Sequence, residues 1–199
     1  MQVQQTTSQN FGARLIRPAT IRIKNDKGKW INDTANFIKF DTTKKADVEA
    51  LERLAYHWDD ANLSAGVAEE ARILRGKSEV YALTNQKYDF KNINPKDILG
   101  VMTTDKTKNA KGNVEVFKIG TDPTFAYEQN RRSRSVKHIA RAMVNEFVRL
   151  VNKNKQVDAI VVHSEPGEEK FLSKVGFKKM DDTLAPKYSI ERDQFSQMI

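Results

Sequence analysis

The stretch RRSRSVKHIARAMVNEFVRLV, residues 131–151, contributes most to the expected fold of this chain. Apolar residues recur along it at the three- and four-residue spacing of a helix that buries one face. They are Val136, Ile139, Ala140, Met143, Val144, Phe147, Val148 and Val151. Its first half, residues 131–141, contains no acidic residue. The pattern predicts a long helix with a basic start.

A basic helix start is suited to a phosphate group. The first N–H groups of a helix have no partner within it, and the helix dipole places partial positive charge there. Cations at this end weaken the helix unless an anion offsets them, so the cluster indicates an anionic ligand. Ser133 and Ser135 allow close approach and can donate hydrogen bonds. The alternative is an ordinary solvated helix start.

Patterns on both sides of this helix indicate one α/β domain. Strands are expected before it at residues 19–24, 29–31, 37–40, 80–84, 98–102 and 114–119. Two helices are expected between residues 42 and 74. After it, residues 159–162 form an apolar run typical of a central strand, and a short helix follows at about 167–175. We expect residues 1–36 to be a partly disordered N-terminal extension with a hairpin, and residues 37–199 to be the main domain.

Composition excludes several kinds of site. The 199 residues contain no cysteine, which excludes a disulfide framework, a thiolate zinc site and a cysteine nucleophile. With three histidines, no metal site is predicted. We find neither a signal peptide nor a membrane-spanning run, and expect a cytoplasmic protein. The net charge of +8 suits a polyphosphate ligand, a nucleic acid or an acidic surface.

The basic loop and its helix resemble a motif of the GNAT superfamily of acyl-CoA-dependent N-acyltransferases. That family carries R/Q-x-x-G-x-G/A where its central strand turns into its main helix. The segment Arg132-Ser133-Arg134-Ser135-Val136-Lys137 matches the arginine and the apolar residue between the two glycine positions. The segment Ile98-Leu99-Gly100-Val101 is similar to the family's preceding strand, which often holds a glycine. The resemblance covers about residues 37–190.

A second family pattern combines a strand with a short helix that ends in Gly-Phe. Counted back from Gly176 and Phe177, the strand positions fall on Ala159 and Val161, and an apolar helix position falls on Phe171. The two anchors together, in the observed order of strands and helices, carry the resemblance.

Four residues depart from the family patterns. Ser135 and Lys137 stand at the two glycine positions. Leu172 stands where many members have a tyrosine that protonates the departing thiolate, and Glu165 stands at the usual asparagine position. The customary acid is therefore missing, although Tyr127 or Tyr188 could supply a hydroxyl.

The resemblance implies a central mixed, mostly antiparallel twisted sheet with helices on both faces. It also implies acetyl-CoA as co-substrate, with cofactor-binding residues Ile119, Arg132, Ser133, Arg134, Ser135, Val136, Lys137, His138 and Leu172. An amine of a small molecule or a protein would attack the thioester directly, while a backbone N–H near Ile119 polarises the carbonyl. Glu115 and His163 are the candidate bases.

Two alternatives remain open from the sequence. Leu172 and the replaced glycines are compatible with a protein that binds acyl-CoA without catalysing transfer. The net charge is compatible with a nucleic-acid-binding domain, but the basic run lacks interleaved aromatic residues and matches no nucleic-acid motif. We therefore predict an N-acetyltransferase with an unidentified acceptor, and neither a membrane nor a nucleic acid as partner.

Overall fold

The computed structural model describes residues 12–58, 61–73, 77–87, 89–90, 92–126, 135–181 and 186–198. Its strands are β1 (Arg14–Lys24), β2 (Trp30–Lys39), β3 (Ser78–Thr84), β4 (Ile98–Asp105), β5 (Gly112–Thr121), β6 (Val136–Lys137), β7 (Val157–His163), β8 (Lys178–Lys179) and β9 (Lys187–Glu191). Its helices are α1 (Lys45–His57), α2 (Ala61–Ile73), α3 (Pro123–Ala126), α4 (Ile139–Val151) and α5 (Glu169–Lys174). Two 3₁₀ segments complete the described structure, η1 (Pro95–Asp97) and η3 (Arg192–Gln197).

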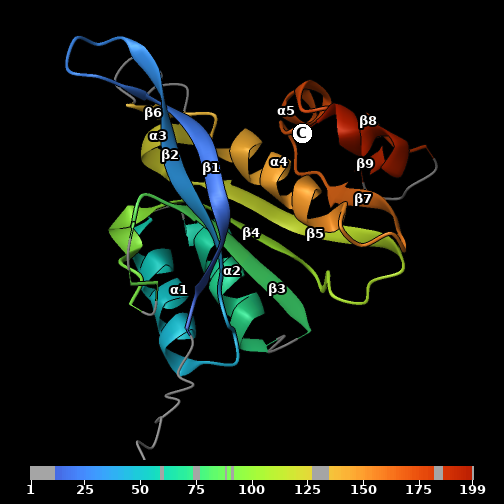
Figure 1. Cartoon of the computed structure of the whole chain (residues 1–199). Coiled ribbons are helices and arrows are strands. Elements are labelled where there is room, and N and C mark those ends of the chain that lie inside the picture. The colour runs from blue at the N-terminus through green and yellow to red at the C-terminus, as the bar shows by residue number, and fades with distance from the viewer. Residues whose placement is uncertain are drawn as a thin grey trace, which may run out of the picture.

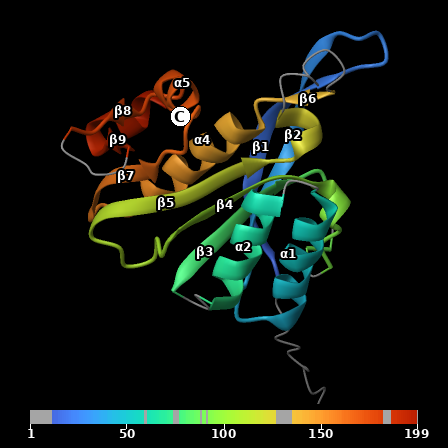
Figure 2. The ribbon, with the colours of Figure 1, turned by 180° about the vertical axis from the view of Figure 1, so that it is seen from behind.

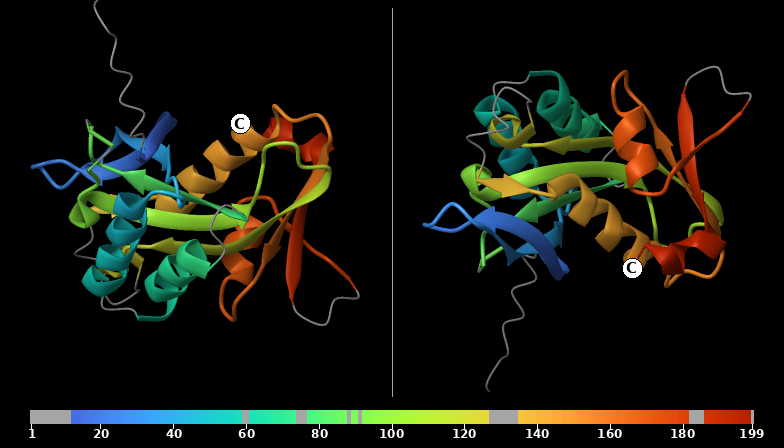
Figure 3. Two further views of the ribbon diagram at one scale, coloured as in Figure 1. Left: turned by 90° about the horizontal axis from the view of Figure 1, so that it is seen from below. Right: turned by 90° about the horizontal axis from the view of Figure 1, so that it is seen from above.

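The described strands form one sheet in the order β6-β1-β2-β3-β4-β5-β7-β9-β8 (Figure 1). Neighbouring strands are antiparallel except for β5 and β7, which are parallel. Helices α1 and α2 cover one face of the sheet, and α4 covers the other (Figure 3). The fold class predicted from the sequence is therefore confirmed. None of the described helices is both long and apolar enough to cross a membrane.

The hairpin of β1 and β2 is part of this sheet. The two strands pair over their whole lengths, and Ala19, Ile21 and Ala35 are buried in the core against α4. The expected boundary at residue 36 therefore falls inside β2. The two short strands expected at residues 29–31 and 37–40 are one strand, because β1 also pairs with the polar residues between them. The end of the hairpin projects beyond the other strands (Figure 2).

Helix α4 begins at Ile139, three residues after Val136, the first residue of the predicted apolar stripe. Val136 and Lys137 instead form β6, which pairs with β1, and His138 adopts left-handed backbone angles of φ 69° and ψ 20°. From there the helix follows its predicted apolar stripe. Phe147, for example, meets Tyr81 edge-on with ring centroids 5.6 Å apart. Burial of a side chain of this size stabilises the fold by about 1.5–3 kcal/mol.

Strands β5 and β7 separate along their length. Their pairing runs from Gly112 and Val157 to Val116 and Val162, whereas β5 continues to Thr121 paired with β4 alone. A bulge opposite Thr103 and Thr104 of β4 marks the point of separation. Strands β5 and β7 are therefore neighbours that separate at one end, and the gap between their ends is where the candidate site lies.

Candidate functional site

A cavity of about 440 Å³ opens where β5 leaves β7. Its walls come from β5, α3, β6, α4, β7 and the region of α5. The lining residues are Ile119, Thr121, Phe125, Val136, Lys137, His138, Ile139, Ala140, Val162, Gly167, Glu168, Phe171 and Leu172. The structure thus brings together five of the residues that the resemblance assigned to the coenzyme: Ile119, Val136, Lys137, His138 and Leu172.

One end of the cavity is formed by the N-terminus of α4. Ile139 and Ala140 line it, and the first helical hydrogen bond runs from the N–H of Ala142 to the carbonyl of His138 at 2.8 Å. The N–H groups before Ala142 therefore have no acceptor within the helix. The first turn, all of it described, holds no acidic residue. This end of the cavity carries partial positive charge and suits an anion.

The backbone of His138 shapes this end. Neither Ser135 nor Lys137, which stand at the family's glycine positions, has a positive φ; His138, the next residue, does. A non-glycine residue in this region costs about 1–2 kcal/mol. The tight turn into the helix is therefore made one residue later than the motif suggested.

Part of the expected phosphate loop lies outside the described residues. Arg132, Ser133 and Arg134 are among these, as is Tyr127. Ser135 is described but does not line the main cavity. Its carbonyl accepts a hydrogen bond from the N–H of Lys24 at 2.8 Å, and it borders a smaller neighbouring cavity of about 290 Å³.

Leu172 lies at the inner wall of the main cavity and is 1% exposed. Tyr188, considered as a substitute for the missing hydroxyl, is buried in the core on β9 and does not line the cavity. Sequence reasoning overlooked Glu168, which precedes Leu172 by one helical turn and lines the same wall. Burial raises the pKa of the Glu168 carboxyl, although its hydrogen bond from the N–H of Glu165 acts in the opposite direction.

The two candidate bases form a contact on the other face of the sheet. Val114 and Val116 pack in the core beneath α4, so the alternating side chain of Glu115 points to the opposite face. There His163 Nε2 lies 3.0 Å from Glu115 Oε2, and both side chains are about one-third exposed. His163 directly follows Val162, which lines the cavity. The pair therefore lies at the point of separation, with the cavity on the opposite face.

Lys187 of β9 completes this cluster. Its Nζ lies 3.2 Å from Glu115 Oε1. Burial by itself would raise the pKa of Glu115, but hydrogen bonds from His163 and Lys187 outweigh it and lower the pKa below its usual value. Glu115 is therefore a carboxylate at neutral pH. Sequence reasoning overlooked Lys187, because it lies opposite His163 only through the pairing of β7 with β9.

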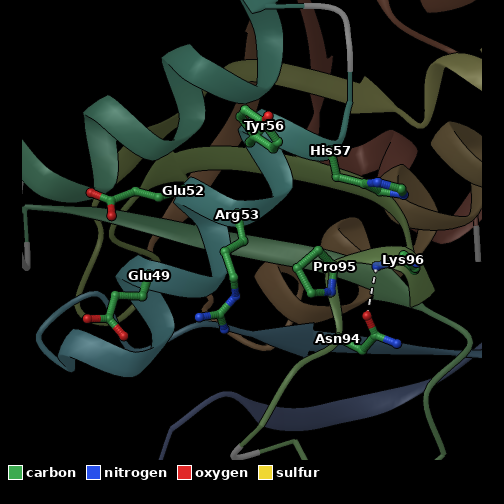
Figure 4. Close-up of a pocket in the computed structure, with 8 residues that line it drawn as sticks. All are labelled: Glu49, Glu52, Arg53, Tyr56, His57, Asn94, Pro95 and Lys96. Carbon is green, nitrogen blue, oxygen red and sulfur yellow. Dashed lines mark hydrogen bonds between the residues drawn. The ribbon is translucent and has the colours of Figure 1, made fainter.

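A second hollow of about 520 Å³ lies between α1 and η1. Figure 4 shows side chains of α1 on one side, among them Glu52 and Tyr56, and Pro95 and Lys96 on the other. Tyr56 is 94% exposed, and none of the predicted site residues lines this hollow. The main cavity is therefore the one that matches the sequence.

Comparison with known proteins identifies the fold. No family model and no curated protein sequence matches the chain. Among solved structures, a GNAT-family protein from Desulfovibrio desulfuricans matches with a TM-score of 0.53 and 13% identity, covering 79% of this chain and 99% of that one. The KacTA–DNA complex matches with a TM-score of 0.49 and 14% identity, covering 72% of this chain and 92% of that one. AtaTR bound with AcCoA matches with a TM-score of 0.48 and 10% identity, covering 67% of this chain and 83% of that one. The chain has a GNAT-like fold, as its motifs indicated.

Proposed function

We propose that this protein is an N-acyltransferase that uses acetyl-CoA and transfers the acyl group to an amine acceptor. The observation that carries this proposal is the cavity between the separated ends of β5 and β7, which leads to the N-terminus of α4. A cavity lined largely by apolar side chains suits the pantetheine arm, and a helix N-terminus beside Lys137 suits the pyrophosphate. The GNAT-like fold supports the same assignment.

In this proposal the thioester lies beside Ile119 and Leu172. Beyond Val116 the edge of β5 is not paired with β7, so a backbone N–H on that edge can polarise the thioester carbonyl. The amine attacks from the face that carries His163. Because Glu115 accepts the hydrogen bond of Nε2–H, the other ring nitrogen, Nδ1, is left to accept the proton of the amine.

The products balance without a tyrosine. The new bond joins the amine nitrogen to the acyl carbon, the carbon–sulfur bond breaks, and the coenzyme leaves as a thiolate that takes a proton from water. Loss of a general acid costs roughly 10²–10⁴ in rate, whereas holding the two reactants together supplies about 7–11 kcal/mol. Positioning is therefore the larger contribution, and Leu172 is compatible with catalysis.

Calorimetric titration with acetyl-CoA tests the site, followed by a screen of amines and peptides for turnover. Reversing Arg132 and Arg134 to Glu should abolish coenzyme binding and leave the fold intact, because the pyrophosphate would lose its cations. The control is the reversal of Lys153 and Lys155, two exposed lysines beyond the end of α4, which changes the net charge equally. Unchanged affinity in the Arg132/Arg134 variant would refute the proposed site.

The second candidate is a protein that binds acyl-CoA without transferring the acyl group. The observation in its favour is Leu172, a buried aliphatic side chain at the position that the resemblance aligns with the family's acid. Tight binding of acetyl-CoA together with no turnover over the whole amine and peptide panel would favour this reading.

A further inference from the structure

The end of the β1–β2 hairpin lies against β6, immediately before the N-terminus of α4 (Figures 1 and 2). Val136 pairs with Ile23, and Lys137 pairs with Arg22. Residues that pair across two strands, or lie two apart along one strand, share one face of the sheet. Arg22 and Lys24 of β1 and Lys137 of β6 therefore lie on the same face. Three cations on one face repel one another, and an anion stabilises them.

Trp30 lies on that face as well, because it pairs with Lys24. The Nζ atom of Lys137 lies 4.0 Å from the centroid of the Trp30 ring, and that of Lys24 lies 5.5 Å from it. An ammonium group is attracted to the face of an indole, and its far side can still donate hydrogen bonds. Since Lys137 also lines the main cavity, the indole restrains a long side chain in the wall of that cavity.

We propose that Trp30 is a positioning residue of the coenzyme site: it holds the ammonium of Lys137 where that group binds the pyrophosphate. The inference rests on the proposed function. In the family motif a glycine at this position lets the backbone approach the phosphates. Here a fixed ammonium supplies the positive charge instead, because a bare lysine would lose more conformational freedom on binding. The hairpin then belongs to the site.

The first test compares acetyl-CoA with S-acetylpantetheine, which lacks the pyrophosphate, by calorimetry. Trp30→Ala and Lys137→Ala should each weaken acetyl-CoA binding by roughly threefold to tenfold, in keeping with a single ammonium–indole contact. Neither should affect S-acetylpantetheine. Trp30→Phe, which keeps an aromatic ring, should retain most of the affinity that Trp30→Ala loses. The double variant Trp30→Ala/Lys137→Ala should bind acetyl-CoA no more weakly than Lys137→Ala alone. The matched control is Ile31→Ala, the adjacent residue on the other face, which is 43% exposed.

The second test uses fluorescence, since the chain contains two tryptophans. Trp58 is 2% exposed in the core, so Trp58→Phe leaves Trp30 as the reporter. Its emission should change on titration with acetyl-CoA, with the dissociation constant found by calorimetry, and should not change with S-acetylpantetheine. If Trp58→Phe does not fold, the ligand-dependent change in wild type should disappear in Trp30→Phe.

The outcomes separate the two proposals. If wild type does not bind acetyl-CoA, the proposed function fails. If wild type binds but Trp30→Ala binds with unchanged affinity, the inference fails alone. It also fails if Trp30→Ala weakens both ligands equally, because the hairpin would then only support the fold, or if Trp30 emission stays constant while acetyl-CoA binds.

Discussion

His163 Nε2 and Glu115 Oε2 lie 3.0 Å apart, although the two residues are 48 positions apart in the sequence. The contact exists because β5 and β7 are parallel neighbours in a register that pairs Glu115 with Val161. Each residue was a separate candidate from the sequence. The structure joins them, together with Lys187, into one hydrogen-bonded cluster at the point where the strands separate.

This contact predicts that Glu115 and His163 act as a unit. His163→Ala should lower kcat by roughly 10²–10⁴ with little change in the KM for acetyl-CoA, because the cluster lies on the face opposite the cavity. Adding Glu115→Gln to His163→Ala should cost little more than His163→Ala alone. Steady-state kinetics of the single and double variants checks this. The prediction is contradicted if the losses in kcat of the two single variants multiply in the double variant, or if His163→Ala loses affinity for acetyl-CoA.

The position of Leu172 predicts a gain of function. If Leu172→Tyr raises the turnover of an identified acceptor by about tenfold or more, the site keeps the family geometry and natively lacks an acid. If the variant binds acetyl-CoA but is inactive, Leu172 lines the acyl or acceptor pocket and the new ring obstructs it. Phe171→Tyr, on the same helix and the same cavity, is the matched control. A variant identical to wild type in binding and rate would show that Leu172 is not at the site.

Alanine substitutions at Gly100 and at Gly66 should change the stability of the fold in opposite directions. A Cβ at Gly100 would lie 2.6 Å from Met143 Sδ and 2.9 Å from the carbonyl oxygen of Gly120, so Gly100→Ala should destabilise the fold by about 1–3 kcal/mol. At Gly66, within α2, a Cβ would meet the flexible end of Lys118, and alanine favours a helix by about 1 kcal/mol. Chemical denaturation of both variants checks this. Equal stabilities would show that α4 tolerates displacement from β4.

Glu79 predicts a pH dependence of stability. Burial would raise the pKa of its carboxyl, but bonds from Lys39, Tyr81 and Thr107 outweigh burial and lower that pKa below its usual 4.5. The unfolded chain therefore binds the proton more readily than the folded one. The stabilisation is complete above about pH 4.5 and is lost as the pH falls through the lowered value.

Glu79→Gln should remove this dependence. At pH 7 we expect a loss of about 1–3 kcal/mol, and below pH 4.5 the curves of variant and wild type should converge. The control is Glu49→Gln, which removes an exposed pair with Lys45 and should cost about 0–1 kcal/mol. The measurement is the denaturation midpoint of wild type and Glu79→Gln over a range of pH. The prediction is contradicted if the midpoints of the two proteins change in parallel with pH.

The sequence was sufficient for features that depend on local patterns. The apolar spacing of α4 and the apolar run of β7 were visible because each element buries its own side chains against one layer. Gly100 was noted through the resemblance, and its close approach to Met143 gives the physical reason. The GNAT-like fold was expected from the resemblance, which the two motif anchors and the order of these elements carry together.

Several features that depend on pairing between distant strands were not predicted. The start of α4 was placed too early because the pairing of Val136 with Ile23 is invisible to local periodicity. For the same reason residues 1–36 were set apart, and the contact of Trp30 with Lys137 was not anticipated. In each case the pairing joins residues far apart in the sequence, which local patterns do not reveal.

The order of the strands also bears on self-association. Both outer strands of the described sheet, β6 and β8, are two residues long and carry lysine: Lys137 in one, Lys178 and Lys179 in the other. Beside β6, the long strand β1 includes Pro18, which has no N–H to offer a neighbouring chain. Short, charged or proline-bearing rims resist edge-to-edge growth into aggregates. The segment that we assign to coenzyme binding thus also covers Arg22 and Ile23 of β1, so deleting it should expose this part of the β1 edge to pairing with another molecule.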